Sequence, residues 1–175
     1  MAPIFTVDWE TYFNAVIPKE EWWKFSLEIE EPTHYLLSLF EKHKIKSIFY
    51  VLGWLKNENP DLFNEIVREG HKIGSHGYWH ERNEHQNGLF RSPYWDKTPI
   101  PWPPSGGFFF RFMPFWYIKW AIKRSGMFWI HPHDIMKDHP RLDDSWLNWK
   151  RHVGIRNSRA KLERLLKEVK FSEPR

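Results

Sequence analysis

The stretch that decides the fold is Ser47-Ile48-Phe49-Tyr50-Val51-Leu52, which is apolar along nearly its whole length. A strand with one face in water alternates apolar and polar residues, whereas a near-continuous apolar run is typical of a strand buried on both faces. Such strands occur mainly in parallel sheets that are covered by helices. The stretch therefore predicts an inner strand of a parallel α/β sheet.

The segments on either side of this stretch alternate between strand and helix. Residues 3–9 are short and apolar, as expected of a strand, and residues 71–75 are expected to return as a third strand after the second helix. Residues 33–44 have helical spacing, with Thr33 as the expected N-cap, and a second helix is expected to start at Pro60. Because a helix separates each strand from the next, the three strands are predicted to be parallel.

The second half of the chain is less regular. Residues 76–107 are rich in proline and glycine, so we expect a long loop there. A helix and a strand at residues 127–131 follow, and residues 132–157 are expected to be mostly loop. Ser158 is the expected N-cap of a final helix. The whole chain, residues 1–175, has the size of a single domain.

The composition narrows the chemistry. The chain has no cysteine, so a metal site would have to use histidine and carboxylate ligands. The net charge of +4 is spread along the chain, and we expect no nucleic-acid partner. Aromatic residues make up 18% of the chain, which predicts a bulky aromatic core together with exposed aromatic platforms that suit sugar rings or a membrane interface.

The distribution of charge also bears on location. The first residues lack a basic segment, so no secretory signal is predicted and a cytoplasmic location is expected. The longest apolar region, residues 107–130, is interrupted by cations and is not expected to span a bilayer. Residues 112–124 could form an interfacial helix in peripheral contact with a membrane, or a buried helix whose cations extend outward.

Five potential metal ligands or catalytic groups each lie just past the end of a predicted strand. They are Asp8, Glu10, His76, His80 and His131. Because the carboxyl ends of parallel strands meet at one edge of the sheet, we expect these side chains to lie close together. The pattern predicts a mononuclear metal hydrolase.

The spacing within two pairs supports this prediction. On a helical turn, His76 and His80 would share a face and could reach one ion. In an extended segment, Asp8 and Glu10 would lie on the same side, so that one could bind the metal while the other stays free as a base. Each pair alone is a weak signal, because the chain has ten histidines and an acidic strand end is often only solvated.

The combined pattern resembles the polysaccharide deacetylases, the NodB-homology group of carbohydrate esterase family four. The four matching motifs are residues 6–13, 75–80, 91–95 and 128–132. Three further stretches are similar to the subgroup found beside exopolysaccharide gene clusters, namely residues 49–54, 106–111 and 151–152. The resemblance covers most of residues 3–80 and 105–171.

The resemblance implies an incomplete, parallel-stranded (β/α) barrel. It also implies a metal-dependent hydrolase of linear amide bonds that removes N-acetyl groups from N-acetylhexosamine units of a glycan. The residues that would hold the ion are Glu10, His76 and His80. Zinc is the simplest expectation, and cobalt, nickel or iron would also suit such ligands.

The resemblance further implies a role for each remaining residue. Asp8 would be the general base, Arg91 would orient it, and His131 would be the general acid. Tyr94 and Trp95 would contact the substrate, with a backbone N–H near Tyr94 facing the oxyanion. The neighbouring His133 is left open as a competing acid, an additional ligand or a surface histidine.

The chain is shorter than the family pattern. Only residues 81–90 separate the second and third motifs, so Arg91 need not return to the site. Missing strand–helix units would leave sheet edges uncovered, which predicts either a homodimer or a half barrel sealed by aromatic side chains. Two other functions therefore stay open: hydrolysis of a non-glycan amide, or sugar binding by an inactive, shortened relative.

Overall fold

A computed structural model describes residues 2–14, 17–80, 103–141 and 144–174. Its centre is a sheet of four strands, β1 (Ile4–Trp9), β2 (Ile48–Val51), β3 (Lys72–Ser75) and β4 (Met127–Ile130). The strands are all parallel and lie in the order β3-β2-β1-β4, which leaves the sheet open in the described part of the chain. The predicted parallel α/β sheet is confirmed, and β2 is buried at every position.

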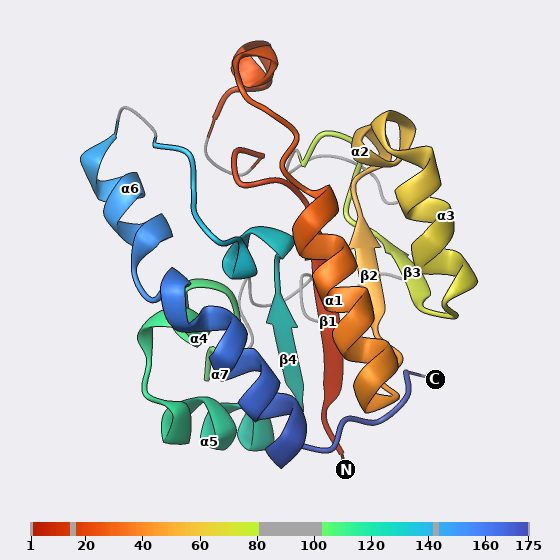
Figure 1. Cartoon of the computed structure of the whole chain (residues 1–175), viewed down its shortest axis with the longest axis vertical. Coiled ribbons are helices and arrows are strands. Elements are labelled where there is room, and N and C mark those ends of the chain that lie inside the picture. The colour runs from red at the N-terminus through yellow and green to blue at the C-terminus, as the bar shows by residue number, and fades with distance from the viewer. Residues whose placement is uncertain (1, 15–16, 81–102, 142–143, 175) are drawn as a thin grey trace.

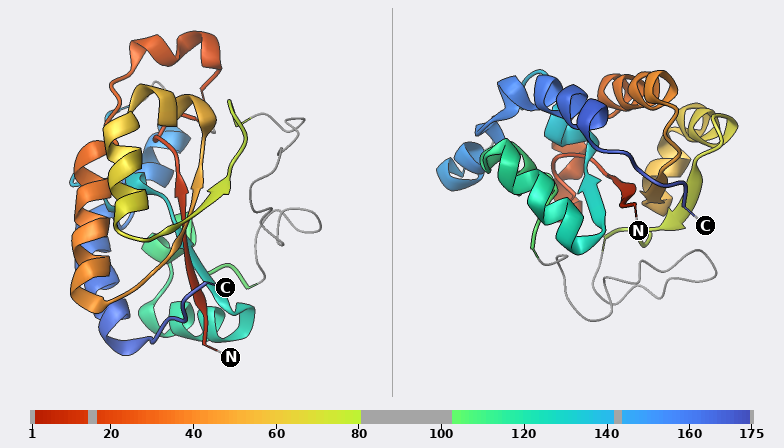
Figure 2. Two further views of the ribbon diagram at one scale, coloured as in Figure 1. Left: turned by 90° about the vertical axis from the view of Figure 1, so that its right-hand side faces the viewer. Right: turned by 90° about the horizontal axis from the view of Figure 1, so that it is seen from below.

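Seven α-helices and two short 3₁₀ helices surround the sheet in the described residues. They are η1 (Lys19–Lys24), α1 (Glu30–His43), α2 (Gly53–Glu58), α3 (Pro60–Arg68), α4 (Gly107–Phe112), α5 (Phe115–Ser125), η2 (Pro132–Ile135), α6 (Ser145–His152) and α7 (Ile155–Glu168). Helices α1, α3 and α7 lie on the same face of the sheet (Figures 1 and 2). None of the described helices is long and apolar enough to cross a membrane.

Aromatic side chains fill the core next to the central strand β1. The Phe5 ring is fully buried and meets Phe40, Phe128 and Phe171 edge to face, with centroid distances of 4.9, 4.9 and 5.2 Å. Edge-to-face contacts add to the free energy that burial of these large rings already contributes. The predicted aromatic core is therefore confirmed.

Two predicted N-caps are wrong. Helix α1 begins before Thr33, whose hydroxyl donates to the Ile29 carbonyl at 2.7 Å and accepts from the Trp9 indole at 3.0 Å. Helix α7 begins before Ser158, whose hydroxyl donates to the Ile155 carbonyl. In both cases the hydroxyl bonds back to a carbonyl of its own helix, which a sequence pattern does not distinguish from capping.

The helix α6 was not expected, because it lies in a segment predicted to be mostly loop. Its N-cap is Asp144, whose carboxylate accepts from the Leu147 N–H at 2.9 Å. Arg151 is the one buried residue of this helix. It therefore lacks the apolar stripe by which amphipathic helices are recognised in a sequence.

The start of α4 lies against the end of β4, and this contact requires a glycine. A Cβ atom at Gly106 would lie 1.7 Å from the Trp129 carbonyl oxygen. We expect Gly106→Ala to lower the free energy of unfolding by about 3 kcal/mol, the upper part of the usual range for overpacking, because backbone must move. Urea unfolding measures the change.

Gly126→Ala is the matched control for Gly106→Ala. Gly126 has a φ of 74° but open space around its Cα, so that variant should carry only the strain of a left-handed backbone, about 1 kcal/mol. An equal loss of stability in the two variants would show that α4 is free to move away from β4.

Candidate metal centre and its cavity

The structure brings together the five side chains that the sequence placed after strand ends. Asp8 lies near the end of β1 and Glu10 directly follows that strand. His76 follows β3, and His131 follows β4. Because β1 lies between β2 and β4 and all strands are parallel, these residues meet at the carboxyl edge of the sheet.

Glu10 is the centre of the cluster. Its Oε2 lies 3.4 Å from Nε2 of His76 and 3.1 Å from Nε2 of His80, while its Oε1 lies 3.4 Å from Nε2 of His131. One ligand atom from each of Glu10, His76 and His80 lies within 4.8 Å of the others. Glu10 is 2% exposed, and its Oε2 has no partner with hydrogen-bond geometry among the described residues. A buried carboxylate oxygen faced by two imidazole nitrogens fits a bound divalent cation.

His76 and His80 come together by a route that differs from the prediction. Residues 76–80 form no helical turn. Gly77 and His80 have φ values of 85° and 69°, which turn the chain so that the two imidazole centroids lie 4.8 Å apart. The Gly77 carbonyl accepts from the Gly53 N–H at 2.9 Å, and this bond ties the loop to the start of α2.

His131 is held by a chain of buried charges. Its Nδ1 lies 2.8 Å from Oδ2 of Asp134, and its backbone N–H donates to the same oxygen at 2.9 Å. Nε of Arg111 donates to the other oxygen of Asp134 at 2.9 Å. This arrangement leaves Nε2 of His131 facing Glu10 and Asp8, at 3.4 and 4.0 Å.

These neighbouring charges determine the protonation states of His131 and Asp134. Burial alone would lower the pKa of His131, but the charge and hydrogen bond of Asp134 outweigh it and raise the pKa to about 9. Burial would likewise raise the pKa of Asp134, but His131 and Arg111 hold it well below its usual range. His131 is therefore a protonated imidazolium beside a permanent carboxylate at neutral pH.

The two carboxylates at the end of β1, Asp8 and Glu10, have opposite pKa shifts. Burial raises the pKa of Asp8, and the nearby His76 and His131 offset only part of that rise. For Glu10 burial also acts upward, but His131, His76 and His80 hold its pKa well below the usual range. The opposite pKa shifts of Asp8 and Glu10 allow the two neighbouring carboxylates to take different roles.

His133 is buried, so the interpretation as a surface histidine is wrong. It is 7% exposed and its ring stacks on His131, with centroids 4.4 Å apart. Burial and the positive charge of His131 lower the pKa of His133 well below its usual range, which makes it a neutral ring and a poor acid. With Glu10 and His131 it forms a second group whose ligand atoms lie within 4.8 Å of one another.

The residues Asp134 and Arg111 were not predicted as part of the site. Asp134 lies three residues after His131 in the turn η2, and this spacing was the only signal that could have identified it. Arg111 is 23 residues away from Asp134 along the chain, and no pattern in the sequence connects them. The predicted residues Arg91, Tyr94 and Trp95 lie outside the described residues.

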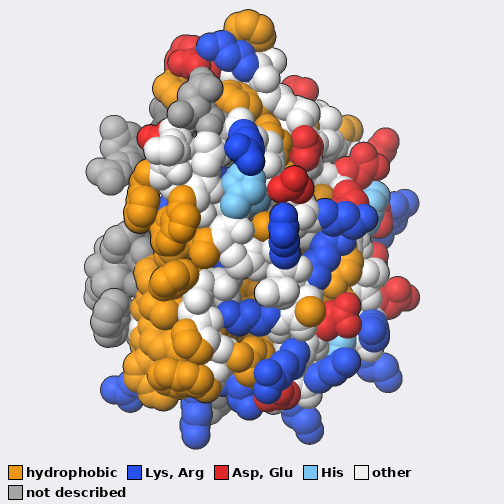
Figure 3. Space-filling model, turned by 60° about the vertical axis from the view of Figure 1, so that its left-hand side comes forward, with side chains coloured by type: hydrophobic (Ala, Val, Ile, Leu, Met, Phe, Trp, Pro, Cys, Tyr) orange, Lys and Arg blue, Asp and Glu red, His pale blue; other side chains and the backbone are white. Residues whose placement is uncertain are grey.

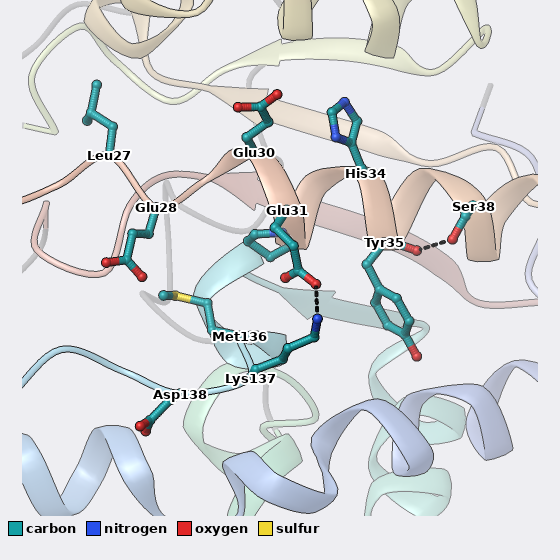
Figure 4. Close-up of a pocket in the computed structure, with 11 residues that line it drawn as sticks. Leu27, Glu28, Glu30, Glu31, His34, Tyr35, Ser38, Met136, Lys137 and Asp138 are labelled. Atoms are coloured by element: carbon teal, nitrogen blue, oxygen red, sulfur yellow. Dashed lines mark hydrogen bonds and ion pairs between the residues drawn. The ribbon is translucent and has the colours of Figure 1, made fainter.

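A cavity of about 490 Å³ opens beside the cluster. Glu10, His131 and His133 line it, together with Arg151 and the aromatic rings of Phe108, Phe109 and Trp129. A larger cavity of about 860 Å³ lies elsewhere, between the start of α1 and residues 136–138 (Figure 4). Its Glu31 is already paired with Lys137 at 3.3 Å and with Arg159 at 2.5 Å. The smaller cavity is therefore the candidate substrate site.

Two family models match this chain. Residues 80–175, more than half of the chain, match the model described as "Domain of unknown function (DUF3473)". Residues 23–94 match the model described as "Polysaccharide deacetylase". The two matches overlap by residues 80–94, so the two models together cover the chain from residue 23 onward.

Curated relatives match over part of their length. A peptidoglycan-N-acetylglucosamine deacetylase of Bacillus cereus is 28% identical over 90 residues, covering 45% of this chain and 42% of the relative. A peptidoglycan-N-acetylglucosamine deacetylase of Listeria monocytogenes is 38% identical over 45 residues, covering 26% of this chain and 10% of the relative. The matched region spans less than half the length of these relatives.

Among solved structures, the peptidoglycan deacetylase PdaC from Bacillus subtilis has a TM-score of 0.45 and 10% identity, covering 96% of this chain and 85% of that one. A CE4 family pseudoenzyme from Bacillus anthracis has a TM-score of 0.46 and 12% identity, covering 98% and 64%. Both likenesses are too distant to inform the chemistry of the site.

Proposed function

Because the chain belongs to the polysaccharide deacetylase family and, through residues 80–175, to the family described as DUF3473, we propose that it is a metal-dependent hydrolase that removes N-acetyl groups from N-acetylhexosamine units of a polysaccharide. The observation that carries the proposal is the cluster of the buried Glu10 with the half-buried His76 and His80, beside Asp8 and His131. It combines a cation site with a proton acceptor and a proton donor, and Glu10 and His131 of this cluster line a cavity.

The residues that would hold the ion are Glu10, His76 and His80. Two imidazoles and one carboxylate suit zinc and leave open positions for ligands from solution, and the same set accepts cobalt, nickel or iron. The buried Oε2 of Glu10, which lacks a hydrogen bond among the described residues, supports a cation at this place. When bound, such an ion polarises a carbonyl group and water.

The protein's own groups move the protons. Asp8 has a raised pKa and takes a proton from the attacking water while the water oxygen bonds to the acetamide carbon. His131 gives its Nε2 proton to the sugar nitrogen as the C–N bond breaks, which releases acetate and a free amine. Asp134 keeps His131 oriented through Nδ1. Roles for Arg91, Tyr94 and Trp95 stay predictions from the sequence.

Asp8→Asn tests this assignment. The variant should keep one equivalent of bound metal, because Asp8 is not in the group formed by Glu10, His76 and His80. Acetate release from N-acetylglucosamine oligomers should fall by about 10²- to 10⁴-fold, the usual contribution of a general base. Metal analysis and an acetate assay measure the two quantities on the same preparation. Loss of the metal, or unchanged acetate release, would contradict the assignment.

A second function is favoured by the exposed aromatic side chains. Figure 3 shows a band of hydrophobic side chains on one face of the molecule. Exposed tryptophans include Trp116 and Trp120 on α5 and the stacked pair Trp146 and Trp149 on α6. Such rings also suit sugar faces, so the alternative is a shortened, inactive relative that binds glycans. Affinity for glycans in a metal-loaded protein that releases no acetate would favour this alternative.

A further inference from the structure

Two buried arginines lie near His131, and their surroundings are opposite. Arg111 has three hydrogen-bond partners: its Nε pairs with Asp134, and its Nη1 donates to the carbonyls of Arg151 and Val153 at 2.5 and 3.1 Å. Arg151 is 7% exposed, and its guanidinium makes no hydrogen bond or ion pair within the described part of the chain. Its Nη1 is completely buried without a partner there.

An unpaired guanidinium in this position is energetically unfavourable. Burial lowers the pKa of Arg151 to about 10, so the group is still charged at neutral pH. Glu10 and Asp134 attract it only at a distance, and both carboxylates already have partners, in the histidines and in Arg111. Proteins seldom bury a charge in this way unless a partner completes it.

Arg151 lines the cavity beside the candidate metal centre. Arg151, Lys150 and His133 all line that cavity, next to Glu10 and His131. Nδ1 of His133 is also buried without a hydrogen-bond partner among the described residues. A guanidinium and an imidazole with unsatisfied nitrogens therefore belong to residues that line the same cavity. A guanidinium fork matches the two oxygens of a carboxylate.

We propose that Arg151 and His133 form a binding site for a carboxylate group in the cavity next to Glu10 and His131. The site itself does not depend on the proposed reaction, but the source of the carboxylate does. It would be either the acetate released by deacetylation or an acidic sugar in the glycan substrate. In both cases one negative charge would complete a buried cation that the described protein residues leave unpaired.

Acetate is the probe for the first experiment, and acetamide is its neutral counterpart of the same shape. The Nε–H signal of Arg151 in the ¹⁵N-labelled full chain is assigned by its absence from Arg151→Gln. Acetate should shift this signal saturably, and acetamide should not. Affinity for acetate should fall about tenfold or more in Arg151→Gln and stay unchanged in Arg156→Gln, which removes an equal charge from the surface. Equal shifts with both probes, or no shift, would overturn the proposal.

Thermal unfolding provides a readout that does not require the assigned signal. Acetate should raise the unfolding midpoint of the wild-type chain, whereas acetamide should not. Arg151→Met should be at least as stable as the wild type without acetate, and it should gain nothing from acetate, since the unpaired charge is gone. A marked loss of stability in Arg151→Met would show that the guanidinium has a structural partner and would overturn the proposal.

Kinetics then distinguish the two sources. If the carboxylate belongs to the substrate, Arg151→Gln should raise KM about tenfold for oligosaccharides that contain uronic acid and leave KM unchanged for neutral N-acetylglucosamine oligomers. If it is the product, Arg151→Gln should relieve inhibition by acetate with both KM values unchanged. A wild-type chain that binds acetate at Arg151 without turnover would contradict the proposed function and leave this site supported.

Discussion

Glu10→Gln is expected to lose metal binding and acetate release together. Glu10 supplies the only carboxylate oxygen in the group with His76 and His80. The substitution keeps the size of the side chain but removes the negative charge that faces both imidazoles. Loss of residues that merely support a metal ligand weakens binding by 10- to 100-fold, so loss of a ligand should weaken it by about 100-fold or more. Titration with zinc and an acetate assay measure both effects.

Glu30→Gln is the matched control, because it removes the same charge from a residue that is exposed at the start of α1. It should leave metal affinity unchanged. Full metal binding by Glu10→Gln would place the ion elsewhere and contradict the assignment of the centre.

Two histidine variants then decide which of the two groups around Glu10 holds the ion. If it is held with His76 and His80, His76→Ala should lose the ion and His133→Ala should keep it. The opposite result would place the ion between Glu10, His131 and His133. Metal analysis of the two purified variants under identical conditions separates these outcomes.

Arg111→Gln is expected to lower the free energy of unfolding by about 3–5 kcal/mol, the usual cost of removing one partner from a buried ion pair. The side chains of Arg111 and Asp134 are 3% and 1% exposed and lie 2.9 Å apart. Without the guanidinium, Asp134 keeps His131 as its one ion-pair partner among the described residues, and the carbonyls of Arg151 and Val153 lose a donor. Urea unfolding measures the change.

The double variant Arg111→Gln with Asp134→Asn tests the reason for that loss. If an unpaired carboxylate causes most of the destabilisation, neutralising it should recover part of the stability, so that the double variant is more stable than the sum of the two single changes predicts. Strict additivity would show that Arg111 acts mainly through its bonds to the backbone of residues 151 and 153.

The parallel sheet could be predicted because burial on both faces leaves a direct mark on the sequence. β2 needs apolar side chains at every position, and the segments before and after it carry the period of helices. The caps at Thr33 and Ser158 could not be predicted in the same way. A hydroxyl near a helix start can bond either to the free N–H groups or to its own helix, and the surrounding packing determines which.

The helix α6 shows why the unexpected part of the site escaped prediction. Its buried residue is the charged Arg151, whose position depends on bonds between Arg111 and the backbone 40 residues further along. Hydrophobic periodicity carries no information about such a contact.

What the sequence determined by itself is the sheet and the set of side chains at its carboxyl edge. Both follow from local rules, since the residues that end parallel strands must share one edge whatever the loops do. Only the tertiary structure decided how those side chains work together. It paired Asp134 with Arg111, gave Asp8 and Glu10 opposite pKa shifts, and placed Arg151 beside the cavity without a charged partner among the described residues. Burial and charge act through space, so these properties arise only when segments far apart in the chain come into contact.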